Sequence, residues 1–337
     1  MEVLVVTHPK YVEHLAGAGH PERPERLAAV LDGISSDGLG DTIVGVEPRA
    51  ITMAELELVH TPAHIAAIDE ICRRGGGAID PDTAVSAASY DVALLAAGAG
   101  PTAVERLRTS GARAAFCAVR PPGHHALADR AMGFCLFNNI AVSAAVLADA
   151  GERVVVVDFD VHHGNGTQAI FWDDPRVLYL SMHEYPLYPG TGSLAEIGGS
   201  NALGATVNLP FPAGTTGDSF LAACDDVVAP LASAFGATWM LLSAGFDAHR
   251  RDPLAGLALS AGDYFAMTAR LAALVPAGRV VAFLEGGYDL DALASSAAAC
   301  VAALAGASLS TEAPTSGGPG REVVAAALKL RDRLLDP

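Results

Sequence analysis

The sequence is poor in basic residues and in cysteine. Lysine and arginine together number 21 against 38 aspartates and glutamates, which gives a formal net charge of −17. Because no run of Lys or Arg is available to neutralise phosphates, we do not expect nucleic acid as a direct partner. The five cysteines lie far apart and form no C-x-x-C pair, so neither a disulfide framework nor a thiolate zinc site is expected.

Long apolar runs are also missing. The Ala-rich stretch 295–309 is too short and too weakly apolar to cross a bilayer, so we expect a packed helix there and no membrane partner. The first apolar run, 2–7, has no basic segment before it and is followed by His-Pro, which favours a first strand over a secretory signal. The expected location is therefore the cytoplasm.

The chain does have the residues for a large core, with a hydrophobic content of 51% in 337 residues. Short β-branched runs alternate with Ala/Leu-rich segments, which predicts an α/β fold with a single-domain, doubly wound, mainly parallel sheet. Several of these runs are continuously apolar, as expected for strands covered by helices on both faces. The expected strands are 2–7, 113–119, 153–160, 177–183, 205–210, 239–245 and 279–287, and the expected helices are 141–150, 219–235, 262–275 and 291–305.

The organisation along the chain is simple. We expect one main domain over 1–310, a loop over 311–320 (TEAPTSGGPG) and a C-terminal helix over 321–337 that packs on the same domain. Gly75-Gly76-Gly77 is interpreted as a flexible turn, because the other residues of a phosphate-binding loop are missing. His60 and His64 flank Thr61-Pro62, an N-cap and a first-turn proline, so a helix start explains them better than a metal site.

Ionisable residues recur at the ends of the expected strands. In open α/β sheets, ligands bind beyond the carboxyl ends of the strands, so these positions are candidates for a site. They are His124 and His125 after 113–119, Asp158, Asp160 and His162 around the end of 153–160, the stretch EYPLYPGTG after 177–183, Asp247 after 239–245 and Tyr288 after 279–287. Scattered structural residues have no reason to choose the same end of five strands.

The stretch DFDVH at 158–162 suggests a metal centre. Side chains alternate along an extended backbone, so Asp158, Asp160 and His162 are expected on one face. Imidazole and carboxylate without thiolate are typical of a catalytic zinc or similar divalent ion with three protein ligands and one open position. Asp247 is the expected third ligand. The alternative is that an aspartate caps the following turn and the histidines are satisfied core groups.

The pair His124-His125 suggests acid–base chemistry. A tight Pro-Gly turn can bring both imidazoles to one cavity, one as general base and the other as acid or electrostatic partner. Asp158 and Asn165 are available to orient them. Tyr288 follows two glycines and offers a phenol that can donate to a developing oxyanion. The alternatives are two surface loop histidines and an ordinary half-buried tyrosine.

These residues resemble the histone deacetylase superfamily, which also holds bacterial acetylpolyamine amidohydrolases and acetoin-utilisation proteins. Seven segments match in order over about residues 5–300: HPERPERL (20–27), RPPGHHA (120–126), GFCLFNN (133–139), DFDVHHGNGTQ (158–168), YPGTG (188–192), SAGFDAH (243–249) and EGGYDL (285–290). The resemblance implies an arginase-deacetylase fold and a zinc-dependent amidohydrolase that deacetylates or deacylates acyl-lysine in proteins or peptides.

The resemblance also implies residue roles. Zinc would be held by Asp160, His162 and Asp247. The catalytic residues would be His124, His125 and Tyr288, with Asp158 and Asn165 as the respective partners of the two histidines. Asn165 and EGGYDL are similar to the class II branch. Structural potassium is implied near Asp158, Asp160, His162, Ser181 and Met182, with a second ion near Phe171.

Substrate contacts follow from the same resemblance. Gly133, Phe134 and Tyr188 match the narrow channel of the family, and Arg26 matches an arginine near its inner end, although a structural ion pair explains Arg26 equally well. Leu254 stands where polyamine-directed relatives carry an acidic residue, which favours acyl-lysine or a neutral acyl amide. Asp82 is expected to orient a substrate backbone amide or to cap a turn.

Other functions remain open from the sequence. The nearest is an amidohydrolase of acetylpolyamine or another small acylated amine, and one from a different class is a non-catalytic acyl-lysine binding module. A binuclear arginase-like hydrolase fits less well, because the stretch 243–247 offers a single aspartate. The expected partners are an acylated lysine protein or peptide or a small acylated amine, with the oligomeric state left open.

Overall fold

The fold is built on one large parallel sheet. The computed structural model describes residues 1–36 and 39–335. Its eight-stranded sheet has the order β2-β1-β5-β10-β9-β6-β7-β8, and every neighbouring pair is parallel. The strands are β1 (Val3–Val6), β2 (Ile43–Val46), β5 (Ala114–Cys117), β6 (Val154–Asp158), β7 (Val177–Glu184), β8 (Thr206–Phe211), β9 (Trp239–Ala244) and β10 (Val280–Leu284). The predicted α/β class is confirmed.

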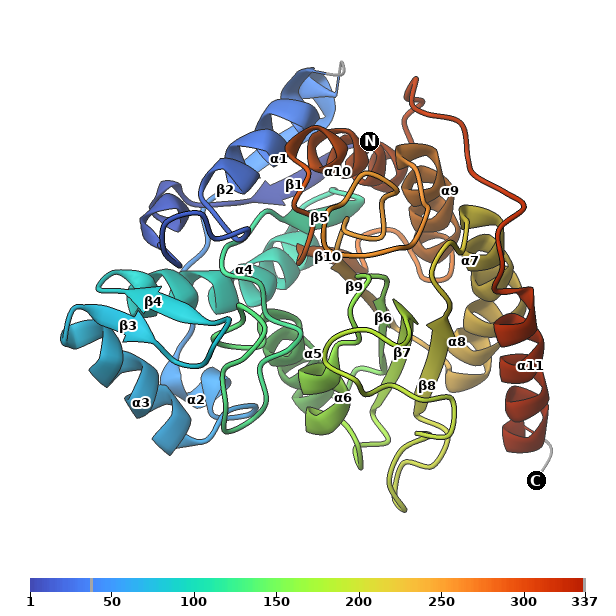
Figure 1. The fold of residues 1–337 in the computed structure, drawn as a ribbon, viewed down its shortest axis with the longest axis horizontal. Helices are drawn as coiled ribbons and strands as arrows, with labels where there is room; N and C mark the ends of the chain where they lie inside the picture. Colours follow the sequence, from blue (N-terminus) through green and yellow to red (C-terminus); the bar gives the residue numbers. More distant parts are fainter. Residues whose placement is uncertain (37–38, 336–337) are drawn as a thin grey trace.

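Helices cover both faces of this sheet (Figure 1). On one side α1, α10, α9 and α7 pack in sequence against one another, and on the other side α4 packs on α5. The helices are α1 (Glu25–Ser36), α2 (Met53–Leu56), α3 (Pro62–Arg73), α4 (Ser89–Thr109), α5 (Asn139–Asp149), α6 (Asn165–Ile170), α7 (Gly217–Ala223), α8 (Ala229–Phe235), α9 (Ala261–Ala272), α10 (Leu290–Ala305) and α11 (Arg321–Leu335). Because both faces are covered, the central strands can be apolar throughout, as β6 and β9 are.

Most predicted elements are confirmed within a few residues. The predicted helix 219–235 is α7 and α8 joined by a π-helical turn, Cys224–Val228. Thr61 caps α3 by accepting from the His64 amide, and Pro62 is its first residue, as predicted. His60 and His64 are both buried, and each binds a backbone carbonyl. All five cysteines are free and buried.

The glycine triplet is a turn only in part, because Gly75 lies in the turn after α3 but the other two glycines do not. Gly76 begins β3 (Gly76–Ala78), which pairs antiparallel with β4 (Ala84–Ser86) in a small second sheet. Gly76 has φ 94°, and a Cβ there would lie 2.2 Å from the Val85 carbonyl oxygen, so only glycine allows the strands to approach this closely. The sequence did not predict β2, β4, α1 or α4.

The C-terminal segment packs back on the body. Thr315, in the loop before α11, donates through Oγ1 to Asp263 of α9 at 2.8 Å and accepts from the Gly217 amide of α7 at 2.8 Å. α11 contacts β8 and α7, and it runs along the outer side of the molecule in Figure 1. The last two residues of the predicted helix, 336 and 337, lie outside the described residues. In the described part of the chain, no helix is long and apolar enough to span a bilayer.

Candidate active site

The site forms where four central strands end. β5, β10, β9 and β6 are consecutive neighbours in the sheet, so the loops after them meet at one edge. The loop after β5 carries His124 and His125, the loop after β6 carries Asp160 and His162, and β9 and β10 are followed by Asp247 and Tyr288. The carboxyl-end geometry of a parallel sheet thus brings together residues that are far apart in sequence.

Asp160, His162 and Asp247 form a compact group of ligand atoms. These atoms all lie within 4.8 Å of one another. His162 Nδ1 is 3.2 Å from Asp160 Oδ1 and 3.2 Å from Asp247 Oδ2. Asp247 Oδ2 is buried and accepts no well-directed hydrogen bond. A divalent ion would supply the missing partner, and the oxygen and nitrogen donors fit zinc.

Backbone amides fix the two carboxylates. The Gly286 amide donates to Asp160 Oδ2 at 2.8 Å, and the Val161 amide donates to Asp247 Oδ1 at 2.8 Å. The His162 amide also donates to Asp160 Oδ1 at 2.8 Å, so both oxygens of Asp160 are held, whereas Asp247 is held through one oxygen and its Oδ2 points to the ligand group. Hydrogen bonds of this kind orient metal ligands and contribute to metal affinity.

The group has more negative charge than it can hold without cations. Burial raises the pKa of Asp247, and the neighbouring Asp160 charge raises it further. Burial also opposes ionisation of Asp160, but the cations of His124 and His162 outweigh it and bring the pKa of Asp160 below its usual range. A bound divalent cation would relieve this repulsion, since it would be the largest local charge.

The two adjacent histidines face different partners. Their ring centroids are 4.0 Å apart. His124 Nδ1 is 3.0 Å from Asp158 Oδ2, and His125 Nδ1 is 2.8 Å from Asn165 Oδ1. The structure therefore brings each predicted histidine to its predicted partner, one a carboxylate and the other an amide.

The surroundings of the two rings shift their pKa values in opposite directions. Burial lowers the pKa of His124, but Asp160 and Asp158 outweigh it and raise the pKa to about 10. Burial and the His124 and His162 charges hold the pKa of His125 well below its usual value. Two titratable groups whose environments separate their pKa values are suited to opposite roles in proton transfer.

A cavity of about 210 Å³ opens above these groups. Phe134 and Tyr188 form part of its wall, and the Tyr188 ring meets the His125 ring edge-on at 5.2 Å. Phe134 has φ 68°, which is rare for a residue with a side chain. The residues that line the cavity are Asp82, Pro122, His124, His125, Gly133, Phe134, His162, Leu187, Tyr188, Leu254, Gly286 and Tyr288.

Tyr288 is held from three sides. Its amide donates to Asp252 Oδ2 at 2.7 Å, its ring lies 5.9 Å from the Phe134 ring, and the Arg26 guanidinium lies 4.9 Å from its centroid. Arg26 donates to the carbonyls of Glu285 and Gly287, so it supports the turn before the tyrosine. Arg26 also pairs with Glu22, which agrees with the structural alternative.

Asp82 supports the cavity wall. Its Oδ1 accepts from the Gly133 amide at 3.2 Å and from Thr83 Oγ1 at 2.8 Å. The turn at 80–83 is capped by Asp80, which accepts from the amides of Asp82 and Thr83. Asp82 instead joins this turn to the segment of Gly133, and it lines the cavity. Ser181, Met182 and Phe171, in contrast, do not line it. Ser181 pairs with Asp158 in the β6–β7 ladder, and its Oγ contacts His183 Nδ1 at 2.8 Å. Potassium at these positions stays a prediction.

Sequence reasoning missed two buried acids beside the site. Asp252 accepts from the amides of Tyr288 and Leu254, and Glu285 accepts from the amides of Gly123 and His124. Both contacts are to backbone, which leaves no pattern of paired side chains in the sequence. Their places in DPLAG and EGGYDL were the available signal.

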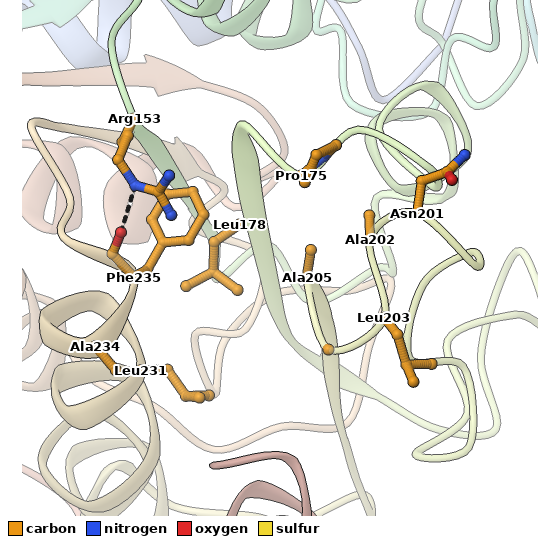
Figure 2. Close-up of a pocket in the computed structure, with 11 residues that line it drawn as sticks. Arg153, Pro175, Leu178, Asn201, Ala202, Leu203, Ala205, Leu231, Ala234 and Phe235 are labelled. Atoms are coloured by element: carbon orange, nitrogen blue, oxygen red, sulfur yellow. Dashed lines mark hydrogen bonds between the residues drawn. The ribbon is translucent and has the colours of Figure 1, made fainter. Parts of the chain in front are cut away.

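A second cavity, of about 320 Å³, is lined by Arg153 and Pro175, which come just before β6 and β7 at the opposite edge of the sheet. Figure 2 shows the residues that line it. Arg153 donates from Nε to the Phe235 carbonyl at 2.5 Å and lies over the Phe235 ring. Of the described residues that line this cavity, Arg153 alone is ionisable. It therefore offers no acid–base pair or ligand group, and the 210 Å³ cavity is the candidate active site.

Comparisons with known proteins agree with this geometry. The family described as histone deacetylase domain matches residues 20–304. A probable deacetylase of Archaeoglobus fulgidus is 39% identical over 313 residues, which cover 91% of this chain and 87% of that protein. Histone deacetylase 15 of Arabidopsis thaliana is 40% identical over 306 residues, 89% of this chain and 55% of that protein, so the chain spans little more than half of this relative. The crystal structure of the HDA15 HD domain superposes with a TM-score of 0.91 at 36% identity and covers 98% of this chain and 96% of its own.

Proposed function

The chain belongs to the histone deacetylase family, and from this premise we propose that it is a zinc-dependent amidohydrolase that removes acyl groups from lysine side chains of proteins or peptides. One observation carries the proposal. Two imidazoles, one paired with a carboxylate and the other with an amide, stand beside a three-ligand group in a single cavity. This combination suits hydrolysis of an amide by an activated water.

Asp160, His162 and Asp247 are the proposed zinc ligands. Zinc bound there would polarise the amide carbonyl and acidify the attacking water. The hydrogen bonds from Gly286 and Val161 would hold the two carboxylates in place. We keep potassium near Asp158 and Ser181 as a part of the proposal that rests on family resemblance alone.

Proton transfer is assigned to the histidine pair. His125, which burial and its neighbours keep neutral, takes the proton as water attacks the carbonyl carbon. The Tyr288 hydroxyl donates a hydrogen bond to the tetrahedral oxyanion. The C–N bond then breaks, and a protonated imidazole returns the proton to the leaving amine. Water is consumed, and the products are a carboxylate and a free amine.

The cavity wall supports an acyl-lysine substrate. Phe134, Leu187, Tyr188 and Leu254 offer apolar surface that matches an aliphatic lysine stem. A polyamine would present a second ammonium group, for which Leu254 offers no counter-charge. The Asp82 carboxylate at this cavity keeps a small acylated amine as the second candidate, because it could meet such a cation.

The test is acetate release by zinc-loaded enzyme from an acetyl-lysine peptide and from an acetylated polyamine. We expect preference for the peptide and a loss of at least about a hundredfold in kcat for Tyr288→Phe, since the oxyanion loses a donor. Tyr185→Phe is the matched control, because Tyr185 is exposed and does not line the cavity.

The possible outcomes separate the candidates. Preference for the polyamine would keep the mechanism and overturn the argument from Leu254. Full activity of Tyr288→Phe would remove the assigned role of the phenol. Zinc binding without hydrolysis of either substrate would favour another acyl group or the non-catalytic binding module.

A further inference from the structure

Glu285 is a fully buried acid whose hydrogen-bond donors are two backbone amides and a hydroxyl, not cationic side chains. It follows β10 directly, and none of its surface is exposed. Its Oε2 accepts from the Gly123 amide at 2.7 Å and from the His124 amide at 3.2 Å. Its Oε1 accepts from the Ser243 hydroxyl at 3.3 Å. The carboxylate thus joins the end of β10 to the turn that carries the histidine pair.

That turn depends on side chains for part of its hydrogen bonding. Residues 121–126 form neither helix nor strand and are buried, so their amides and carbonyls need partners. Backbone supplies some of them, because the Ala126 amide donates to the Gly123 carbonyl at 3.0 Å and the Gly166 amide donates to the His124 carbonyl at 3.1 Å. Asn138 Nδ2 donates to the Ala126 carbonyl at 3.1 Å, and Asn139 Nδ2 donates to the Pro121 carbonyl at 3.1 Å. The amides of Gly123 and His124 are met by Glu285.

The turn has little freedom to find another arrangement. A Cβ on Gly123 would lie 2.5 Å from the Asn139 amide nitrogen, so the turn sits against the start of α5. Glu285 is itself anchored, because its amide donates to the Ala244 carbonyl at 3.2 Å and its carbonyl accepts from Arg26 at 2.5 Å. The next residue, Gly286, donates to the proposed zinc ligand Asp160.

We propose that Glu285 is a positioning residue, whose carboxylate holds the Gly123-His124 turn in register with the metal ligands and the Tyr288 turn. The inference rests on the proposed function for its effect on the reaction, but the contact itself can be tested without substrate. It also specifies what matters about Glu285, namely its hydrogen-bond acceptors and not its charge.

Three substitutions separate these properties. Glu285→Gln keeps an acceptor for the two amides and can donate to Ser243 Oγ, so we expect kcat within about threefold of wild type. Glu285→Leu keeps the approximate volume and leaves two buried amides without an acceptor, so we expect kcat to fall at least about thirtyfold. Glu285→Asp keeps the charge but is one methylene shorter, and we expect a fall of at least about tenfold.

KM should change little in all three variants, because Phe134, Tyr188 and Leu254 still hold the substrate stem. Asp263→Ala is the matched control for stability. Asp263 is buried and also accepts from backbone amides, but it belongs to α9 and does not line the cavity. We expect it to lower the melting temperature and to leave kcat of the folded enzyme unchanged.

Hydrogen exchange of the Gly123 and His124 amides, followed by NMR, gives a readout that needs no substrate. Exchange should be slow in wild type and in Glu285→Gln, and faster in Glu285→Leu and Glu285→Asp. This pattern would support the inference even if wild-type enzyme hydrolysed no acyl amine, a result that would overturn the proposed function alone.

Two results would overturn the role of Glu285. One is an unchanged kcat in Glu285→Leu or, should that variant fail to fold, in Glu285→Asp. The other is a kcat of Glu285→Gln as low as that of Glu285→Leu while Glu285→Asp keeps the wild-type value, because charge and not hydrogen bonding would then be the property that matters.

Discussion

At the scale of single residues, the ligand group depends on neighbours that have no side chain. A Cβ added to Gly245 would lie 1.9 Å from Asp160 Oδ2, and one added to Gly286 would lie 1.9 Å from Asp247 Oδ2. Neither position has a φ that requires glycine. The reason for glycine at both is therefore space for the carboxylates, which must approach one another within a packed interior.

Gly286→Ala tests this requirement. The new methyl group must displace the Asp247 carboxylate, so we expect zinc affinity to fall by at least about tenfold. Affinity can be measured by competition with a chromophoric chelator, which does not depend on activity. Gly111→Ala is the control, because Gly111 is exposed and a Cβ there meets nothing within 4 Å. Unchanged affinity in Gly286→Ala would argue against Asp247 as a ligand.

The ligands and the histidine pair could be predicted from sequence because their residue types are specific to the chemistry. Two carboxylates and an imidazole are typical metal ligands. Asp160, His162 and Asp247 each follow a strand of a parallel sheet, which places them at the same edge. Glu285 and Asp252 could not be predicted in the same way. Their partners are mainly backbone amides, whose positions depend on loop conformation and not on residue type.

At the scale of secondary-structure elements, one buried carboxylate joins three segments. Glu22, just before α1, accepts from Arg120 after β5 through Nε at 2.5 Å and Nη2 at 2.7 Å. Arg120 also donates to the Tyr11 carbonyl of the short 3-10 helix Pro9–Glu13, and Arg26 of α1 donates to Glu22. Burial would raise the pKa of Glu22, but Arg120 and His14 outweigh it and lower the pKa to about 2.

This shift predicts a dependence of stability on pH. The pKa of Glu22 is lower in the folded chain than the value of about 4.3 expected when unfolded, so ionised Glu22 stabilises the fold above that pH. The contribution, about 3 kcal/mol, is lost as pH falls from about 4.3 through about 2. Glu22→Gln should therefore be less stable at neutral pH and differ less from wild type in acid.

Urea unfolding of both proteins between neutral and acidic pH measures this difference. Glu25→Gln, an exposed position on α1, is the control and should follow the wild-type curve. A gap between wild type and Glu22→Gln that stays constant down to about pH 2 would show that the ion pair does not titrate in this range.

The elements that could be predicted are those whose own residues favour the structure that they form. β6 and β9 are apolar runs bounded by turns, and the sequence reveals them directly. β2 has only four residues, includes a glycine and lies at the edge of the sheet. α4 contains Pro101 and two glycines, and its packing outweighs these weak local preferences. A Cβ on Gly100 would lie 1.8 Å from Ser143 Oγ of α5. Close packing of the two helices therefore requires glycine at this position, although glycine lowers helix propensity.

At the scale of the whole molecule, the catalytic groups and the net charge act on different steps. The histidine pair and the two carboxylate ligands are buried at one edge of the sheet, and His162 is only partly exposed, so bulk salt screens their interactions little. The formal net charge of −17 is spread over the chain and produces a field that reaches into solvent. The field should therefore attract a cationic substrate before it binds and raise its rate of association. The rate of the chemical step should not depend on that field.

This separation predicts a selective effect of salt. The test uses two acetyl-lysine peptides of equal length, one flanked by lysines and the other by glutamines. Raising the salt from about 50 mM to about 500 mM should lower kcat/KM about tenfold for the cationic peptide and less than about twofold for the neutral one, because screening shortens the range of attraction.

For both peptides kcat should stay nearly constant, since the reacting groups are buried. The salt is potassium chloride throughout, so that a potassium requirement is always met. An equal loss of kcat/KM for the two peptides would mean that salt acts on the enzyme itself, and a fall in kcat would place the effect at the buried groups. Only a loss confined to kcat/KM of the cationic peptide assigns the net charge a role in substrate capture, because only encounter depends on a field that extends through solvent.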